Sequence, residues 1–219
     1  KRQEHHFAAK ARALQSETTL EDAGSAFIVQ QAKASIVNIN HLLASVDLGK
    51  IEQAAERLGT ARKVILAGSM SSRPFIDYLG YMASMAFDNW HILGDGPNSD
   101  AGLIYDVTEN DTALIISKAP YAASSIKAAK HLRDRGAYVI GITDGISSPL
   151  CQYCNSTFFI ATETPQFFTS HAATLVLLET LIGIVVGKGG EAVSNRIANI
   201  EATSLAVGEY YPKTEQLNQ

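Results

Sequence analysis

The chain of 219 residues has few of the residues that mark specialised protein classes. It contains two cysteines, one tryptophan and six prolines, and charged residues make up 18% of it. Two cysteines are too few for the disulfide framework of a small secreted domain and are typical of a reducing compartment. The low proline content and the 46% of hydrophobic residues exclude a disordered or low-complexity chain. The composition therefore indicates one α/β domain with a full core and some helical extension.

An excess of positive charge is also missing. The formal net charge is −4, so the bulk composition gives no indication of nucleic-acid binding by this chain. The basic residues of the first dozen positions indicate a helical tail or a linker over residues 1–18. There is no signal-peptide pattern, and the longest apolar stretch, 172–187, is interrupted by Glu179 and is shorter than a bilayer span. We therefore expect a cytoplasmic protein without a membrane partner.

The two cysteines stand close together as Cys151-x-x-Cys154. Zinc binding needs two more ligands at suitable spacing, and a redox pair is expected at the start of a helix that follows an early strand. This pair instead follows Ser148-Pro149-Leu150 and precedes a candidate strand. We expect small buried apolar residues here, and neither a metal nor another cofactor.

The first third of the chain has helical periodicity. Thr18 and Glu21 form a capping box, after which apolar residues recur at steps of three and four along one face. A second helix is expected to begin with Asp47 as its N-cap and to end at Gly59.

After residue 62, short apolar runs alternate with helical stretches. The candidate strands cover residues 63–67, 89–93, 112–117, 137–142 and 157–161. The candidate helices cover residues 72–87, 98–106, 121–135, 169–187 and 191–207. Strands that are apolar on both faces and separated by helices indicate a parallel sheet covered on both sides. We therefore predict a three-layer α/β sandwich with a five-stranded parallel sheet, preceded by N-terminal helices. The domain would cover residues 19–211, with 212–219 as a C-terminal tail.

Two loops that follow strands have the composition of a ligand site. One reads Gly68-Ser69-Met70-Ser71-Ser72, and the other reads Ser117-Lys118-Ala119-Pro120-Tyr121-Ala122. Small and hydroxylated residues between a strand and a helix aim backbone N–H groups and hydroxyls at an anionic ligand. Right-handed crossovers place both loops at the same sheet edge, where we expect them to form one pocket.

Two other positions have structural interpretations. We expect Met70 to be an apolar plug beneath the helix that follows the first loop. Glu179 is an isolated acid in an apolar helix, and such a residue is rarely left unpaired. Its candidate partners are a ligand, a hydrogen bond at an interface, or a buried arginine such as Arg73 or Arg196.

The loops and the segments after them resemble a sugar isomerase (SIS) domain. The resemblance rests on Gly68-x-x-x-Ser72, on Ser117, on Ile142-Thr143-Asp144 and on Ser148-Pro149-Leu150. The stretch from Glu163 to Ser170 and the closing Gly208-Glu209-Tyr210 are similar to the RpiR-type transcriptional regulators. The resemblance covers residues 20–211. It implies a flavodoxin-like SIS fold that senses a small-molecule effector, and a DNA-binding helix-turn-helix domain that is absent from this chain.

The two loops also depart from the pattern of the family. The first loop of the family usually reads Gly-x-Gly-x-Ser, and Met70 replaces its second glycine. The second loop usually reads Ser-x-Ser-Gly-x-Thr, of which only Ser117 remains. Each lost hydrogen bond to a charged phosphate is worth about 1.5–3 kcal/mol. The remaining candidates for binding a sugar phosphate, a related acid or a sugar derivative are Gly68, Ser69, Ser71, Ser72, Ser117, Lys118, Tyr121 and Glu163.

Catalysis is an alternative to sensing. An aldose–ketose isomerase needs a general base, usually a carboxylate, and commonly a histidine that opens the sugar ring. Glu163 and His171 stand near the expected pocket edge and are candidates for these roles. Glu163 is as easily a cap or a ligand contact, however, and His171 is more typical of a surface residue at a helix N-terminus.

A module that only dimerises is a third alternative. The expected helix near residue 178 is apolar nearly all round, and the first long helix has an apolar face, so one sheet cannot readily cover both. Surplus apolar surface of this kind is typical of a subunit interface. We therefore predict a homodimer, with Leu175, Leu178 and Ile182 as candidate contacts, and we favour a non-catalytic effector sensor.

Overall fold

The computed structural model of the chain describes residues 6–17, 23–94 and 100–211. Its centre is a parallel sheet of five strands in the order β2-β1-β3-β4-β5. The strands are β1 (Val64–Gly68), β2 (Trp90–Ile92), β3 (Thr112–Ile116), β4 (Tyr138–Thr143) and β5 (Ser156–Phe159). Each neighbouring pair is parallel. The predicted five-stranded parallel sheet is confirmed.

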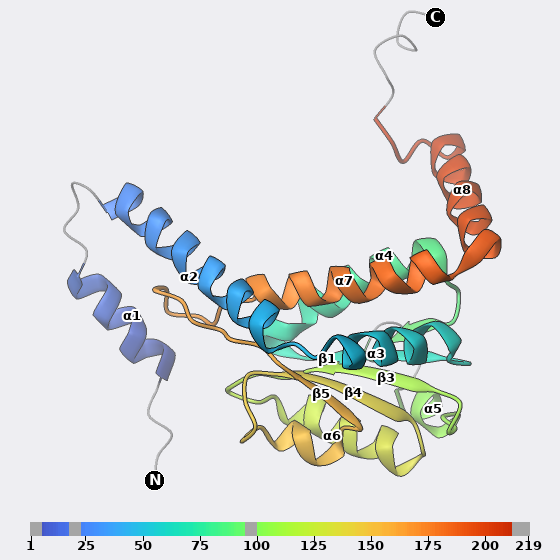
Figure 1. Cartoon of the computed structure of the whole chain (residues 1–219), viewed down its shortest axis with the longest axis horizontal. Helices are drawn as coiled ribbons and strands as arrows, with labels where there is room; N and C mark the ends of the chain where they lie inside the picture. Colours follow the sequence, from blue (N-terminus) through green and yellow to red (C-terminus); the bar gives the residue numbers. More distant parts are fainter. Residues whose placement is uncertain (1–5, 18–22, 95–99, 212–219) are drawn as a thin grey trace, which may run out of the picture.

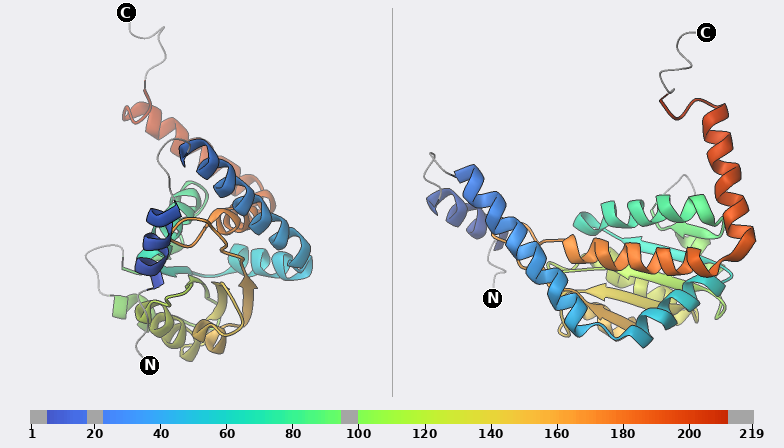
Figure 2. Two further views of the ribbon diagram at one scale, coloured as in Figure 1. Left: turned by 90° about the vertical axis from the view of Figure 1, so that its left-hand side faces the viewer. Right: turned by 45° about the horizontal axis from the view of Figure 1, so that its top comes forward.

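Helices cover both faces of this sheet (Figure 1). The α-helices are α1 (His6–Glu17), α2 (Ala23–Ser45), α3 (Leu48–Thr60), α4 (Arg73–Ala86), α5 (Asp100–Tyr105), α6 (Ala123–Asp134), α7 (Ala172–Lys188) and α8 (Gly190–Ala206). Two 3₁₀ turns, η1 (Met70–Ser72) and η2 (Pro149–Tyr153), follow β1 and β4. The layer of α3, α4 and α7 lies on one face, and α5 and α6 lie on the other. At opposite ends of the molecule, α2 and α8 extend beyond the sheet (Figure 2).

The core consists of two apolar clusters separated by the sheet. Every residue of β1 and β3 is buried, as expected for strands covered on both faces. Because side chains alternate along a strand, Leu114 and Ile116 of β3 join the cluster beneath α3, α4 and α7. Ala113 and Ile115 join the cluster beneath α5 and α6. This alternation also fixes the direction of the residues that follow β3.

The start of α3 is as predicted, and its end is not. Asp47 caps the helix, since its carboxylate accepts hydrogen bonds from the backbone N–H groups of Gly49 and Lys50. The helix continues past Gly59 to Thr60. Gly59 lies where α3 packs on α7, and a Cβ there would lie 3.5 Å from Cγ1 of Val185. The predicted capping box of Thr18 and Glu21 lies outside the described residues.

The central position of α7 overturns two predicted dimer contacts. Leu178 and Ile182 are 0% and 6% exposed and pack in the core of their own subunit. Leu175 is half-buried. The all-round apolar character of α7 arises because α2, α3 and α4 surround it within one chain.

The glycine-rich segment between the last two helices forms a sharp bend. α7 runs through Gly187 to Lys188, and α8 begins at Gly190, whose φ of +66° lies in the region that glycine favours. The direction of the chain bends by 111° between the two helices. Within the described ranges, no single helix has both the length and the apolar composition to cross a bilayer, and only this bent pair meets those criteria when taken together.

Candidate functional site

The first predicted loop lies tightly against the start of α4. A Cβ on Gly68 would lie 2.7 Å from Cγ1 of Ile76 and 3.2 Å from Cβ of Ser72, so only glycine fits at this position. Ser72 is buried beneath the loop, and its backbone N–H donates to the carbonyl oxygen of Ser69. This packing brings the end of β1 directly onto the helix that follows it.

Met70 is not the predicted apolar plug. Its side chain is 70% exposed, and its φ of +55° lies in the left-handed region. That backbone conformation favours glycine. The turn requires a left-handed backbone at this position, which explains why the SIS pattern usually has glycine here. This chain has the same left-handed turn with methionine at the position.

A hydroxyl pair joins this loop to the start of α6. The Oγ of Ser124 donates a hydrogen bond of 2.8 Å to the Oγ of Ser69. Beside the pair lies a cavity of about 510 Å³. The loop contributes Gly68, Ser69 and Met70 to its lining, and α6 contributes Ser124, Ser125, Lys127 and His131. The loops after β1 and β3 lie at one edge of the sheet, as predicted, but the second loop, 117–122, contributes no described lining residue, so the two loops do not form the expected shared pocket.

The first turn of α6 presents backbone N–H groups and a hydroxyl that can donate hydrogen bonds. Its N-cap, Ala122, has no side chain that can accept from the backbone N–H groups. The Oγ of Ser125 is buried without a hydrogen-bond partner among the described residues. Lys127 and His131 lie one turn apart farther along the helix and border the same cavity. These groups form a polar, partly cationic wall suited to an anion.

Lys118 points away from this cavity. It lies two residues beyond Ile116 and therefore faces the α7 layer, where its Nζ donates to Oγ1 of Thr174 and lies 3.4 Å from Nδ1 of His171. The side chain is buried, and burial lowers the pKa of its ammonium group to about 7, against an opposing effect of Asp144. Ser117, one position earlier, is buried with its Oγ unpartnered among the described residues.

His171 is half-buried and is not the surface residue that the sequence favours. Its ring stacks on Phe75 at the start of α4, with 4.1 Å between centroids and 14° between planes. Burial and the neighbouring Lys118 lower the pKa of the imidazole to about 4. The ring is therefore neutral near pH 7, and its Nε2 has no partner in the described part of the chain.

The second predicted loop is fastened to the loop after β4. The backbone N–H of Ala119 donates to Oδ2 of Asp144 at 3.0 Å. Tyr121 lies in the same neighbourhood, where burial and then Asp144 raise the pKa of its phenol. Tyr121 and Ser71 do not border the 510 Å³ cavity.

The backbone of Glu163, and not its side chain, makes the contacts that hold this residue in place. Its side chain is exposed, whereas its N–H and carbonyl group both bond to the side chain of Asn38 on α2. Glu163 is not a lining residue of the cavity either. The other isolated acid, Glu179, accepts a hydrogen bond of 3.0 Å from the hydroxyl of Tyr78, which raises the pKa of that phenol. The described partner of Glu179 is therefore Tyr78, and not Arg73 or Arg196.

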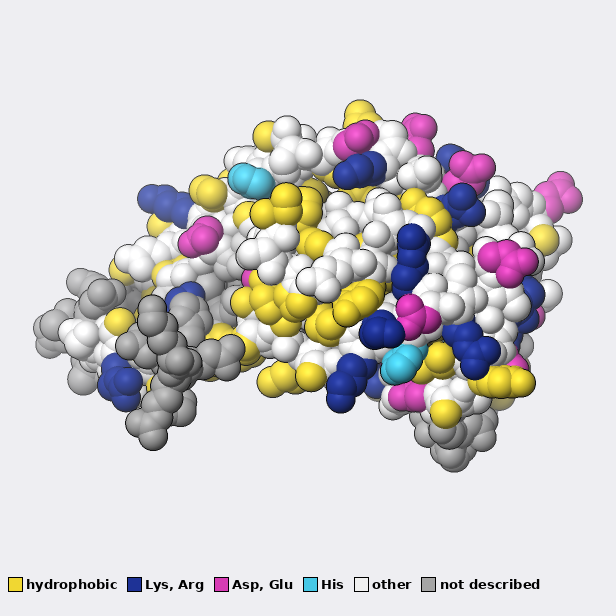
Figure 3. All heavy atoms as spheres, turned by 90° about the horizontal axis from the view of Figure 1, so that it is seen from below, with side chains coloured by type: hydrophobic (Ala, Val, Ile, Leu, Met, Phe, Trp, Pro, Cys, Tyr) yellow, Lys and Arg dark blue, Asp and Glu magenta, His cyan; other side chains and the backbone are white. Residues whose placement is uncertain are grey.

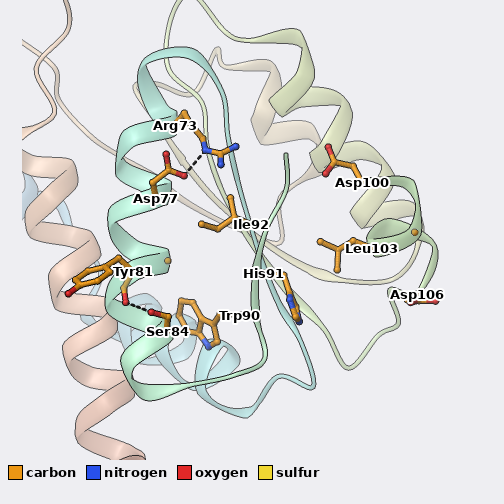
Figure 4. A pocket seen from close by; sticks show the side chains of 12 residues that line it. Arg73, Asp77, Tyr81, Ser84, Trp90, His91, Ile92, Asp100, Leu103 and Asp106 are labelled. Carbon is orange, nitrogen blue, oxygen red and sulfur yellow. Dashed lines mark hydrogen bonds and ion pairs between the residues drawn. The ribbon is translucent and has the colours of Figure 1, made fainter. Parts of the chain in front are cut away.

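A larger groove of about 1020 Å³ runs along the edge strand β2 (Figure 4). It lies between α4 and α5 and carries the carboxylates of Asp77, Asp100 and Asp106. Arg73 pairs with Asp77 at 2.6 Å and borders both the groove and the smaller cavity. Asp100 also borders the smaller cavity, whereas Asp77 and Asp106 lie only in the groove. The greater negative charge of the groove opposes an anionic ligand, so the smaller cavity at the carboxyl end of β1 is the candidate site.

The cysteines have a packing role. Cys151 and Cys154 are half-buried free thiols in and after η2, and the Sγ of Cys154 donates to the carbonyl oxygen of Leu150. Burial raises the pKa of Cys154 to about 11. A side chain on Gly141 of β4 would collide with this sulfur atom. Among the described residues, no three metal-binding side chains come together.

Sequence reasoning missed Ser124, Ser125, Lys127 and His131. Their signal was the helical spacing of polar residues directly after the second loop, which brings positions 124, 127 and 131 to one face. Of the eight predicted ligand residues, Gly68 and Ser69 border the cavity.

Comparisons with known proteins agree with the fold and with the motifs. Residues 92–183 match the SIS domain model. The sugar isomerase domain of an RpiR transcription factor from Sphaerobacter thermophilus superposes with a TM-score of 0.73 at 20% identity, over 80% of this chain and 97% of that chain. The NanR protein of Vibrio vulnificus, solved in complex with ManNAc-6P, superposes with a TM-score of 0.70 at 17% identity, over 92% of this chain and 74% of that chain.

One curated relative is similar in sequence. It is glutamine–fructose-6-phosphate aminotransferase [isomerizing] 1 of Arabidopsis thaliana, 25% identical over 155 residues. The match covers 64% of this chain and 21% of the relative, so the chain spans about a fifth of the length of that protein. Residues 92–183 are thus similar in sequence to a SIS domain, and the parallel sheet with its loops at the carboxyl edge is the fold of the solved sugar isomerase domain.

Proposed function

We propose that this chain is the effector-sensing part of a bacterial transcriptional regulator that binds a sugar phosphate or a related acid without converting it. The hydrogen bond between Ser69 and Ser124 carries the proposal, because it joins the first loop to the start of α6 beside a cavity. The likeness to an RpiR transcription factor and to NanR with its bound ManNAc-6P supports it. Such a regulator would act as a cytoplasmic homodimer.

The wall formed by α6 favours an anionic ligand. The backbone N–H groups at the start of α6 and the hydroxyls of Ser124 and Ser125 are hydrogen-bond donors, and the helix dipole adds positive potential there. The ammonium group of Lys127 borders the same cavity. A phosphate or a carboxylate here would accept several charge-assisted hydrogen bonds.

DNA binding is assigned to a helix-turn-helix domain outside this chain. On the face seen in Figure 3, Lys and Arg side chains are interspersed with Asp and Glu side chains. This face has no continuous basic surface of the kind that binds nucleic acid.

The arrangement of the acid and base candidates supports binding over catalysis. Asp100 is the one carboxylate among the described lining residues, and it accepts a hydrogen bond of 2.7 Å from the N–H of Gly94. Glu163 and His171, the candidates for an isomerase, are not lining residues. Burial and the neighbouring Lys118 also lower the pKa of His171, so its imidazole is not a cationic acid near pH 7.

Calorimetry with hexose 6-phosphates, hexosamine 6-phosphates and the matching unphosphorylated sugars tests the proposal. We expect a phosphorylated sugar to bind, and Lys127→Met to weaken it about tenfold, equal to about 1.4 kcal/mol. Lys130→Met is the matched control, since Lys130 pairs with Asp134 on the same helix and is exposed.

Turnover is measured by NMR on the ligand that binds. We expect no isomer after prolonged incubation with the protein. Isomer formation would establish the catalytic alternative, and a failure of every phosphorylated and acidic sugar to bind would favour a module that only dimerises.

A further inference from the structure

The amine of Lys118 is a buried nucleophilic group that the candidate site does not use. The side chain is 5% exposed and lies on the face of the sheet that α7 covers. It borders neither the 510 Å³ cavity nor the groove along β2. Lysine is almost never buried in this way unless it is paired. Burial is instead a property of the lysines that proteins use as bases and as nucleophiles.

Uncharged groups contact this amine. The Nζ of Lys118 donates to the hydroxyl of Thr174 and lies 3.4 Å from Nδ1 of His171. Of the salt bridges between described residues, none includes Lys118. Asp144 acts on the amine only through its charge, and one of its oxygens accepts from the N–H of Ala119. Within the described part of the chain, the amine therefore has no carboxylate in hydrogen-bond contact to keep it protonated.

The contacts of Lys118 suit a neutral amine. A neutral amine has two N–H donors and one lone pair, so the contacts to Thr174 and His171 use both donors and leave the lone pair available. Burial lowers the pKa of Lys118 to about 7, so near this pH about half of the chains would have the free amine. The free amine is the nucleophilic form of lysine.

His171 adds an unused donor beside the amine. Its ring is held by the stack on Phe75, and its imidazole is neutral near pH 7. A neutral imidazole has one N–H, and because Nδ1 accepts from Lys118, the hydrogen lies on Nε2. Nε2 is buried without a partner among the described residues. A buried donor without a partner is uncommon in a native protein, and here it can serve an oxygen atom of a ligand bound at the amine.

We propose that Lys118 is a covalent binding site for a short-chain hydroxyaldehyde, which it holds as a Schiff base beside His171. The lone pair of Nζ attacks the aldehyde carbon and forms a C–N bond, and a proton passes from the nitrogen to the carbonyl oxygen. The hydroxyl formed in this way leaves with the second hydrogen of the nitrogen as water, and a C=N bond remains. The reaction needs neither an oxidant nor a reductant. The N–H of Nε2 would bind the hydroxyl of the aldehyde.

The approach to the amine limits the size of the aldehyde. Thr174 is fully buried behind the amine, whereas His171 is half-buried and Ala119 is exposed. Such a narrow opening suits a short chain and excludes a hexose ring. The site therefore differs from the 510 Å³ cavity in place and in ligand class, and it does not depend on the proposed effector.

Reductive trapping of the 219-residue chain with glycolaldehyde and cyanoborohydride tests the proposal. Near pH 7 we expect peptide mapping to find the alkyl group on Lys118 about tenfold faster than on Lys130, an exposed lysine that pairs with Asp134. Both rates are measured in the same folded wild-type protein, so the comparison does not depend on the stability of a variant. Labelling of Lys118 no faster than that of Lys130 would overturn the proposal.

The pH dependence distinguishes a buried reactive amine from an accessible one. The labelling rate of Lys118 should level off above about pH 8, whereas that of Lys130 should go on rising toward about pH 10. Lys118→Met should abolish the fast labelling, and Lys130→Met should retain it. His171→Phe can keep the stack on Phe75 and should slow the labelling of Lys118 about tenfold, because it removes the acceptor at the amine. Parallel pH profiles for the two lysines, or an unchanged rate in His171→Phe, would refute the proposed site.

Discussion

Asn38 and Glu163, 125 residues apart in sequence, are joined by two hydrogen bonds, in which the side-chain amide of Asn38 uses both its NH₂ group and its oxygen. The Nδ2 of Asn38 donates to the carbonyl oxygen of Glu163 at 2.7 Å, and its Oδ1 accepts from the N–H of Glu163 at 3.1 Å. The amide is fully buried, whereas the carboxylate of Glu163 is exposed. The pair acts as a clamp between α2 and the loop that follows β5.

Asn38→Ala should lower the free energy of unfolding by about 2–3 kcal/mol, because it leaves the two backbone groups of Glu163 without their partners. Chemical denaturation followed by circular dichroism measures this loss. Asn40→Ala is the control, since Asn40 is exposed on the same helix and its truncation should change stability by less than about 0.5 kcal/mol. Equal effects of the two substitutions would contradict a clamp at Asn38.

The buried ammonium group of Lys118 should make stability rise with pH above neutrality. Its pKa is about 7 in the folded protein and 10.5 ordinarily. Between these values the unfolded chain binds more protons than the folded chain, so raising the pH favours folding, by up to about 5 kcal/mol in total. Below pH 7 both states are protonated and Lys118 contributes no slope.

Urea denaturation at intervals from about pH 7 to about pH 9 measures this slope. Lys118→Met should remove most of the increase, whereas Lys130→Met, at an exposed ion pair, should retain it. Parallel curves for the wild type and Lys118→Met would mean that the ammonium group is solvated in the folded protein.

Replacement of Met70 by glycine should stabilise the protein. The φ of +55° at Met70 is unfavourable for a side chain, and the exposed side chain contributes little burial that could be lost. We expect a gain of about 0.5–1 kcal/mol. Ser71→Gly is the control, because Ser71 does not have a positive φ, and glycine there should instead destabilise the turn. Thermal melts of both variants distinguish the two effects.

The N-terminus of α6 offers a second stabilising substitution. Ala122 has the extended backbone of an N-cap, with φ of −69° and ψ of 122°, but no side-chain acceptor. Ala122→Ser should add a capping hydrogen bond and about 1 kcal/mol of stability. Ala123→Ser, one position inside the helix, should give no such gain. A loss of stability in Ala122→Ser would indicate that its hydroxyl cannot reach the first turn.

The fold was predictable because its signals are local. The apolar runs of β1 and β3 and the periodicity of the helices between strands can be read without knowing any tertiary contact. Element ends were less accurate. The expected helix over 169–187 begins only at Ala172, because the backbone of His171 is not helical and its ring instead packs on Phe75.

The location of the site was predictable from the sequence, whereas most of its lining residues were not. Strand order brought the loops after β1 and β3 to one edge, as expected. Whether Lys118 faces α6 or α7 depends on its register with Ile116, and Ser124 becomes a neighbour of Ser69 only through the turn between β3 and α6. The exposure of Met70 depends likewise on one backbone angle, which residue type alone does not reveal.

The clamp between Asn38 and Glu163 makes α2 and the loop after β5 one cooperative unit of the fold. Neither segment can open without leaving a buried amide and two backbone groups unpartnered. Local unfolding of the two segments is therefore a single event, although they are 125 residues apart in sequence. Hydrogen exchange should accordingly report one opening free energy for both.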